Sequence, residues 1–130
     1  MPDMPEIQRG HDVPPAPDAA ETRAEALALA LMGAGAMAQE MLSPDATWQC
    51  GDAPVMVGRG AILAALGALR PPRKIYIEQV VTQGKAGTVS GRLVTDTGGA
   101  RLFCHVIRYT SAAAQQIAQI VSFDHGVKAG

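Results

Sequence analysis

Residues 75–124 of this chain decide the fold: IYIEQVVTQGKAGTVSGRLVTDTGGARLFCHVIRYTSAAAQQIAQIVSFD. Apolar and polar side chains alternate along much of this stretch, as they do in strands that bury one face. Glycine-rich or small-residue segments interrupt it, and Asp96-Thr97-Gly98-Gly99 is a strong hairpin signal. The pattern therefore predicts a four-stranded antiparallel meander, with strands at 75–82, 88–95, 102–110 and 116–124.

Upstream of the meander, the sequence indicates helices. From Ala19 the chain is dense in Ala, Leu, Met and Glu, which favour helix, and Asp18 is the expected N-cap with Glu21 as its capping-box partner. This helix lacks a polar face after Glu25, so it should be buried on most sides. We expect a short second helix at 37–42, a short strand at 45–51, a loop, and a third helix at 60–70 that ends before Pro71-Pro72.

Helices that precede antiparallel hairpins predict an α+β fold rather than alternating α/β. A chain of 130 residues suits one domain. Residues 1–18 hold five of the nine prolines and few large apolar side chains. We therefore expect a flexible proline-rich tail at 1–18 and a single domain at 19–127.

Charge and composition argue against several functional classes. The formal net charge is −1, and the eight Arg and three Lys are scattered, so we expect neither a nucleic-acid nor a membrane partner. The longest apolar run, residues 26–38, is shorter than the roughly 20 residues that span a bilayer. No secretory signal is visible and only two cysteines occur, which favours a cytoplasmic protein with reduced thiols. The Arg-over-Lys and Ala-rich usage points to a bacterial source.

Metal and cofactor motifs are missing from the sequence. His11, His105 and His125 are far apart, without Cys-x-x-Cys or His-x-x-x-His spacing, and the glycines form neither a phosphate loop nor a dinucleotide fingerprint. We expect no metal and no cofactor.

Two short stretches resemble a known superfamily. Ser43-Pro44-Asp45-Ala46-Thr47-Trp48 and Gly58-Arg59-Gly60-Ala61-Ile62 are similar to motifs of nuclear transport factor 2-like proteins, which include ketosteroid isomerases and SnoaL-like polyketide cyclases. The closing stretch 120–125 is similar to the last strand of that family. The resemblance implies a cone-shaped, strongly curved antiparallel or mixed sheet wrapped around the N-terminal helix. It also implies a ligand pocket at the open end and a homodimer through the outer face of the sheet.

Period-two alternation then selects the side chains that would face the pocket. Aligned with the strand order of that family, one face of each strand points inward. The expected pocket residues are Trp48, Cys50, Phe103, His105, Ile107, Tyr109, Gln119, Val121 and Phe123. The alternative is that these side chains fill a small core and leave no pocket.

The catalytic groups implied by ketosteroid isomerases are largely absent. Cys50 stands where their general base, an aspartate, would be, and the first helix has no tyrosine for the oxyanion. His105 matches the position of their late-strand aspartic acid, and it is the candidate acid/base because imidazole titrates near neutral pH. The alternatives are a structural core histidine, or a Cys50–His105 nucleophile–base pair, for which a buried, unreactive Cys50 is the simpler interpretation.

Two functions fit the sequence. The first is a small-molecule-binding domain, with cyclase, isomerase or dehydratase chemistry on an apolar or polycyclic substrate as its specific form. The second is a non-catalytic homodimeric association domain with a filled cone, in which Leu102, Cys104 and Val106 of the outer face make the contact.

Overall fold

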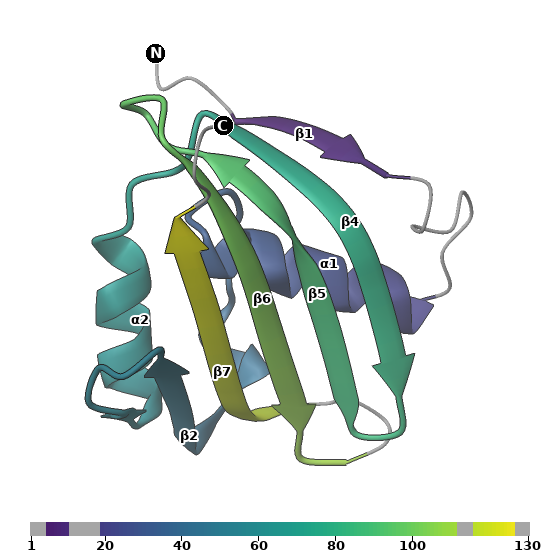
Figure 1. Ribbon diagram of the computed structural model, residues 1–130. Coiled ribbons are helices and arrows are strands. Elements are labelled where there is room, and N and C mark those ends of the chain that lie inside the picture. The colour runs from purple at the N-terminus through teal and green to yellow at the C-terminus, as the bar shows by residue number, and fades with distance from the viewer. Residues whose placement is uncertain (1–4, 11–18, 112–115, 127–130) are drawn as a thin grey trace.

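The computed structural model describes residues 5–10, 19–111 and 116–126. Figure 1 shows the arrangement of its elements. In chain order they are β1 (Glu6–Arg9), α1 (Ala19–Leu31), a 3-10 turn (Gln39–Met41), β2 (Leu42–Cys50), β3 (Met56–Val57), α2 (Arg59–Gly67), β4 (Lys74–Gln83), β5 (Ala86–Val94), β6 (Ala100–Tyr109) and β7 (Ile117–Gly126).

The strands of the described chain form one mixed sheet in the order β1-β4-β5-β6-β7-β2-β3. β4 to β7 pair antiparallel, whereas β1 on β4 and β2 on β7 pair parallel. The sheet is curved and open, with α1 crossing behind it and α2 beside β2 (Figure 1). The predicted α+β fold, with the sheet wrapped around an N-terminal helix, is confirmed.

The meander follows the predicted strands within two residues at each end, and the hairpin turn closes where Asp96 and Gly99 indicated it. β4 carries a register shift between Ile77 and Gln79. Opposite it lies Gly91, where a Cβ atom would overlap the carbonyl oxygen of Tyr76. A β-bulge bends the strand that carries it, and a glycine opposite the bulge allows the two backbones to come close. The bulge in β4 and Gly91 therefore help to curve the sheet around α1.

Helix α1 packs its small and leucine side chains against the concave face. Ala24, Ala28 and Leu27 are almost fully buried, although the helix also exposes several residues near its start. Ala24 would contact a Cβ atom built on Gly87 at 3.2 Å, so the helix approaches β5 closely. This close approach leaves room for only a small side chain at position 24.

β2 starts three residues earlier and α2 ends three residues earlier than expected, and three further features differ in kind from the sequence-based expectation. Residues 37–42 form only a 3-10 turn, because β2 begins at Leu42 and includes Pro44, whose missing N–H is tolerated near a strand end. Met56–Val57 pair with Thr47 and Trp48 as β3, where we expected a loop. The expected N-cap Asp18 lies outside the described residues.

The third difference is β1, inside the segment that was expected to be a tail. Residues 6–9 pair in register with Lys74 to Ile77 of β4, and Arg9 makes two hydrogen bonds, at 2.8 and 2.6 Å, with the carboxylate of Glu25 in α1. Backbone hydrogen bonds hold β1 to β4, and such bonds need no large apolar side chains. The proline-rich composition of this segment therefore gave no sign of a strand. Residues 1–4 and 11–18 lie outside the described part.

Within the described residues, no helix has the length and apolar character needed to cross a membrane.

Candidate functional site

A cavity of about 480 Å³ opens between the concave face of the sheet and the two helices. Leu31 at the end of α1, Met32 directly after it and Ala65 of α2 line the cavity. The sheet supplies residues from β2, β3, β5, β6 and β7. Its floor and walls are formed mainly by apolar groups, among them Trp48, Met56, Leu69, Leu93 and Phe103.

Charged side chains surround the mouth of the cavity as ion pairs. Arg101 Nε lies 2.9 Å from Asp124 Oδ2, and Arg70 lies 3.6 Å from Asp96. All four residues line the cavity, and their side chains are 39–86% exposed. Each cation faces an anion, so the mouth carries no net charge from these four groups.

Three polar side chains from three strands meet in the wall. Trp48 Nε1 of β2 donates a hydrogen bond of 2.9 Å to Ser122 Oγ of β7. The same oxygen lies 2.7 Å from Nδ1 of His105 in β6. His105 is only 5% exposed, and its other ring nitrogen, Nε2, has no hydrogen-bond partner. We call Trp48, Ser122 and His105 the polar triad.

Burial sets the protonation state of the triad. Desolvation lowers the pKa of His105 to about 4, an effect that the negative charge of Asp124 partly opposes. The imidazole is therefore neutral near pH 7. A neutral imidazole can donate a hydrogen bond from one nitrogen and accept one at the other, but its N–H is too weak an acid to lose its proton near neutral pH.

The structure brings four of the nine predicted pocket residues into the cavity wall with their side chains on the concave side. These are Trp48, Cys50, Phe103 and His105. Ile107 and Tyr109 share their face, but both are buried in the packed cluster beyond the cavity, with Leu42 and Ile117.

The three residues predicted from the last strand point the other way. Gln119 and Phe123 are exposed, and Val121 is only half-buried, whereas Ile120 and Ser122 are buried. The cause is a register shift: Tyr109 pairs with Ile117 but Arg108 pairs with Gln119, which leaves Ala118 unpaired. One extra residue inverts the alternation for the rest of the strand. The inward orientation expected for Gln119, Val121 and Phe123 is therefore wrong, although the Phe123 position still contributes to the cavity rim.

Ser122 is the functional residue that alternation missed. The signal that would have found it is the spacing of Ile117 and Ile120, two β-branched apolar residues three positions apart in one strand. Both can face the core only if an extra residue lies between them.

Cys50 lines the cavity as an ordinary thiol. Burial, and then the charge of Asp124, raise the pKa of Cys50, which disfavours the thiolate that a nucleophile needs. His105 directs Nδ1 to Ser122. The alternative of a Cys50–His105 nucleophile–base pair therefore gains no support from the geometry.

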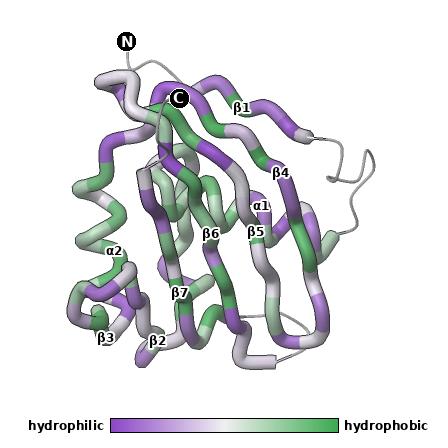
Figure 2. Tube along the Cα trace, in the orientation of Figure 1, coloured by the Kyte–Doolittle hydropathy of each residue, from purple (hydrophilic) through white to green (hydrophobic). Residues whose placement is uncertain are grey.

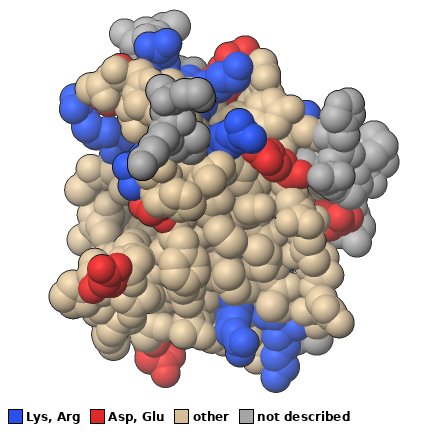
Figure 3. All heavy atoms as spheres, in the orientation of Figure 1, with Lys and Arg blue, Asp and Glu red and all other residues tan. Residues whose placement is uncertain are grey.

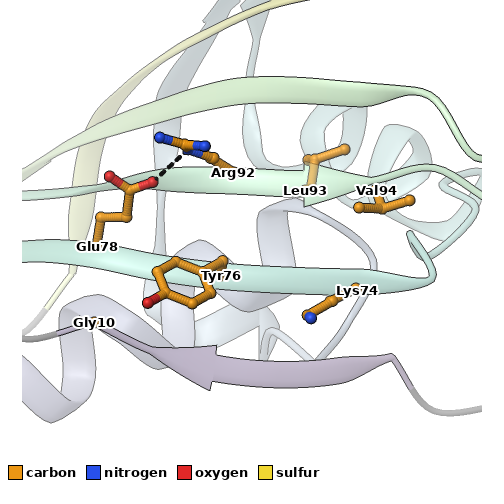
Figure 4. Close-up of a pocket in the computed structure, with 7 residues that line it drawn as sticks. All are labelled: Gly10, Lys74, Tyr76, Glu78, Arg92, Leu93 and Val94. Carbon is orange, nitrogen blue, oxygen red and sulfur yellow. Dashed lines mark hydrogen bonds and ion pairs between the residues drawn. The ribbon is translucent and has the colours of Figure 1, made fainter. Parts of the chain in front are cut away.

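A second hollow of about 500 Å³ lies on the opposite side of the sheet, where β1 meets β4 and β5. Figure 4 shows the Tyr76 ring between Gly10 and the Glu78–Arg92 ion pair, whose atoms are 2.8 Å apart. Its charged side chains are all paired, Glu78 with Arg92 and Lys74 with Glu6, and none of its lining residues has a buried polar atom without a partner. We therefore regard the concave cavity as the candidate site.

Neither a protein-family model nor a curated protein matches this chain. Solved structures do resemble it. An NTF2-like protein of unknown function from Cytophaga hutchinsonii has a TM-score of 0.63 at 12% identity, over 81% of this chain and 98% of that one. A putative SnoaL-like polyketide cyclase from Jannaschia has a TM-score of 0.60 at 14% identity, over 85% and 91%.

A third similar structure is the epoxide hydrolase/cyclase-like enzyme SalBIII, which takes part in pyran ring formation in salinomycin. It has a TM-score of 0.61 at 17% identity, over 85% of this chain and 98% of that one. At these identities the similarity shows a shared fold, the NTF2-like fold that the two sequence motifs indicated.

Proposed function

We propose, on the premise of the NTF2-like fold, that this protein binds an apolar small molecule in the concave cavity. The observation that carries the proposal is the cavity of about 480 Å³ with largely apolar walls and one buried, unpartnered ring nitrogen of His105. Ligand sites typically have this makeup, with apolar walls and a few convergent polar groups.

Similar structures support the proposal at the level of the fold. They include a putative polyketide cyclase and the cyclase-like SalBIII. The specific form of the proposal is therefore cyclisation, isomerisation or dehydration of an apolar or polycyclic substrate. His105 would then act through hydrogen bonding to the substrate rather than as an imidazolium acid, because its lowered pKa keeps the ring neutral.

Binding can be measured through Trp48, the single tryptophan of the chain, which lines the cavity. Tetralin and α-tetralone are suitable probes because they are compact, apolar and bicyclic. We expect either probe to change the fluorescence of Trp48. At about ten times Kd it should stabilise the fold by about 1.4 kcal/mol, which raises Tm by roughly 5 °C.

Two neighbouring alanines of α2 make a matched pair for the control. Ala65 lines the cavity, whereas Ala64 is exposed. Ala65→Phe should place a ring in the cavity and abolish both signals, and Ala64→Phe should leave them intact. If neither probe binds the unaltered protein, or if both variants respond alike, the cavity is not the binding site.

A second proposal concerns association of two copies through the outer face of the sheet. Val81, Leu102, Cys104, Val106, Val121 and Phe123 form an outer patch across β4, β6 and β7; Val81 and Phe123 are 47% and 52% exposed. Figure 3 shows that the middle of this face carries few charged groups. Apolar side chains gathered on one face with few charges favour protein contacts, and a second copy offers the same surface.

Sedimentation equilibrium tests this association. Val106→Asp puts a charge in the middle of the outer patch, and Ala64→Asp puts the same charge on the exposed side of α2. We expect the first variant to be monomeric and the second to associate like the unaltered protein. A monomeric unaltered protein would contradict the proposal.

A further inference from the structure

The hydrogen bonds of the polar triad determine which ring nitrogen of His105 carries the proton. An indole N–H can only donate, so Ser122 Oγ accepts from Trp48. The hydroxyl of Ser122 then has one proton to give and one lone pair left. Among the described residues its second partner is Nδ1 of His105, so one of these two atoms donates to the other.

The two tautomers of His105 leave different numbers of polar groups unpaired. If Ser122 donates its proton to Nδ1, the ring proton sits on Nε2, and only that N–H lacks a partner. If Nδ1 donates instead, the Ser122 proton and the Nε2 lone pair are both buried without partners. Buried unpaired groups are costly, so the first arrangement is favoured.

The distances agree with this assignment. The Trp48–Ser122 contact of 2.9 Å has the usual length of an N–H donor to oxygen. The Ser122–His105 contact of 2.7 Å is shorter and matches a hydroxyl donor.

From this geometry we infer that the cavity recognises a neutral carbonyl oxygen, which accepts a hydrogen bond from Nε2–H of His105. The inference rests on the proposed function and names its ligand class: an apolar ketone, ester or lactone. Ser122 is the positioning residue, because its hydroxyl holds the imidazole in the donating tautomer, and Trp48 orients that hydroxyl in turn.

Charges in the cavity argue against a carboxylate ligand. The ionisable groups that line it with His105 are Cys50 of β2, Arg101 of β6, Asp124 of β7, and Arg70 and Asp96 at the mouth. Both arginines are paired with aspartates, and the thiol has a raised pKa. Desolvation also lowers the pKa of His105 and keeps its ring uncharged. No unpaired cation among these groups would offset a buried anion.

A ligand can reach Nε2 only if the side chains around it move. The atom exposes less than 1 Å² of surface. Met32 and Met56 line the same cavity, and unbranched methionine side chains adapt readily to a ligand. A bound carbonyl would then give the orphaned N–H its partner.

The first test reads the tautomer without any ligand. Long-range nitrogen–proton NMR spectra of histidine-labelled protein near pH 7 should show the ring of His105 protonated at Nε2 and bare at Nδ1. Ser122→Ala should weaken this preference, whereas Ser43→Ala, which removes a hydroxyl that is equally buried but lies outside the cavity lining, should preserve it. A proton on Nδ1 in the unaltered protein overturns the inference.

The second test compares α-tetralone with tetralin, which has the same ring system without the carbonyl. The ratio of their Kd values should shift against the ketone by roughly three- to tenfold in His105→Leu, as expected for the loss of one neutral hydrogen bond. His105→Gln, which keeps an N–H donor, should restore part of the preference. Ser122→Ala should lower it, and Ser43→Ala should not.

These outcomes separate the inference from the proposed function. If both probes bind and Ala65→Phe blocks them, but their Kd ratio is the same in His105→Leu, the cavity binds ligands and the carbonyl inference is wrong. If His105→Leu fails to fold, Ser122→Ala and the NMR tautomer still decide the question.

Discussion

Strands β6 and β7 pair side by side along the wall of the cavity, yet they follow different rules. β6 alternates strictly, with Phe103, His105 and Ile107 buried and the residues between them less so. β7 changes phase at Ala118, so Ile117, Ile120 and Ser122 are buried. In Figure 2 apolar residues occur on both strands, and their colour alone does not reveal which face each one occupies.

The phase of β7 decides what the cavity contains. Without the extra residue, Val121 and Phe123 would face inward and Ser122 would face outward. A phenylalanine would then occupy space near the polar triad, and His105 would lose its hydroxyl partner. The bulge therefore leaves the cavity open and places Val121 and Phe123 on the outer patch.

Two single-residue deletions in β7, of Val121 and of Ala118, should test this phase change with the largest effect. Val121 deletion inverts the faces of all later residues in β7, turns Phe123 inward and breaks the Trp48–Ser122–His105 chain. We expect a loss of more than about 4 kcal/mol of unfolding free energy, or no folding at all. Urea denaturation followed through Trp48 fluorescence measures it.

Deletion of Ala118 is the matched control. Because Arg108 pairs with Gln119 and Tyr109 with Ile117, removing the unpaired residue leaves a continuous register and the same buried face. We expect a cost of roughly 1–2 kcal/mol, from loss of the local bend. Equal effects of the two deletions would contradict this account of β7.

The two phenylalanines sharpen the same comparison. Phe103 of β6 is 4% exposed and Phe123 of β7 is 52% exposed, although Phe103 pairs with Asp124, the residue after Phe123. Phe103→Ala should cost about 3–5 kcal/mol, and Phe123→Ala should change stability by less than about 1 kcal/mol, because half its surface stays in solvent in the folded monomer. Thermal unfolding at low protein concentration provides both values, and a larger effect at Phe123 would show that the strand faces inward there.

A smaller effect than those of the Val121 deletion and Phe103→Ala is expected on the pH dependence of stability. The pKa of His105 is lowered from 6.5 to about 4 in the folded protein. Between these values the unfolded chain binds a proton that the native ring does not, so stability falls as the pH falls through that window and is not lost further below it. From about pH 7 to about pH 5 the loss should be roughly 2 kcal/mol.

His105→Gln isolates this contribution. Its unfolding free energy should fall less over the same range, and the slopes of the two pH profiles should differ only between about pH 4 and 6.5. Parallel pH profiles would show that His105 is charged or exposed in the native state.

Much of the fold could be predicted from local pattern. Alternation and turn residues located the four long strands, and the alanine- and leucine-rich composition located α1, because these signals act within a few residues of one another. β1 and β3 were missed because a short strand depends on the partner backbone it pairs with. The predicted helix at 37–42 was wrong because pairing of Leu42 with Ile117 extends β2 into it.

The sequence by itself determined the α+β class, the curved sheet around α1, and the inward face of β6 with His105. The α+β class follows from hydrophobic periodicity and turn chemistry, which are local, whereas the curvature around α1 and the inward face of β6 were implied by the resemblance to NTF2-like proteins that residues 43–48 and 58–62 carry. Only the tertiary structure decided that Ser122 faces His105 and Trp48, because one unpaired residue in β7 reverses a period-two pattern and its position depends on pairing with β6. The tertiary structure also decided that Ile107 and Tyr109 fill the core while Phe103 lines the cavity, since the distance between helices and sheet is not encoded in any one strand.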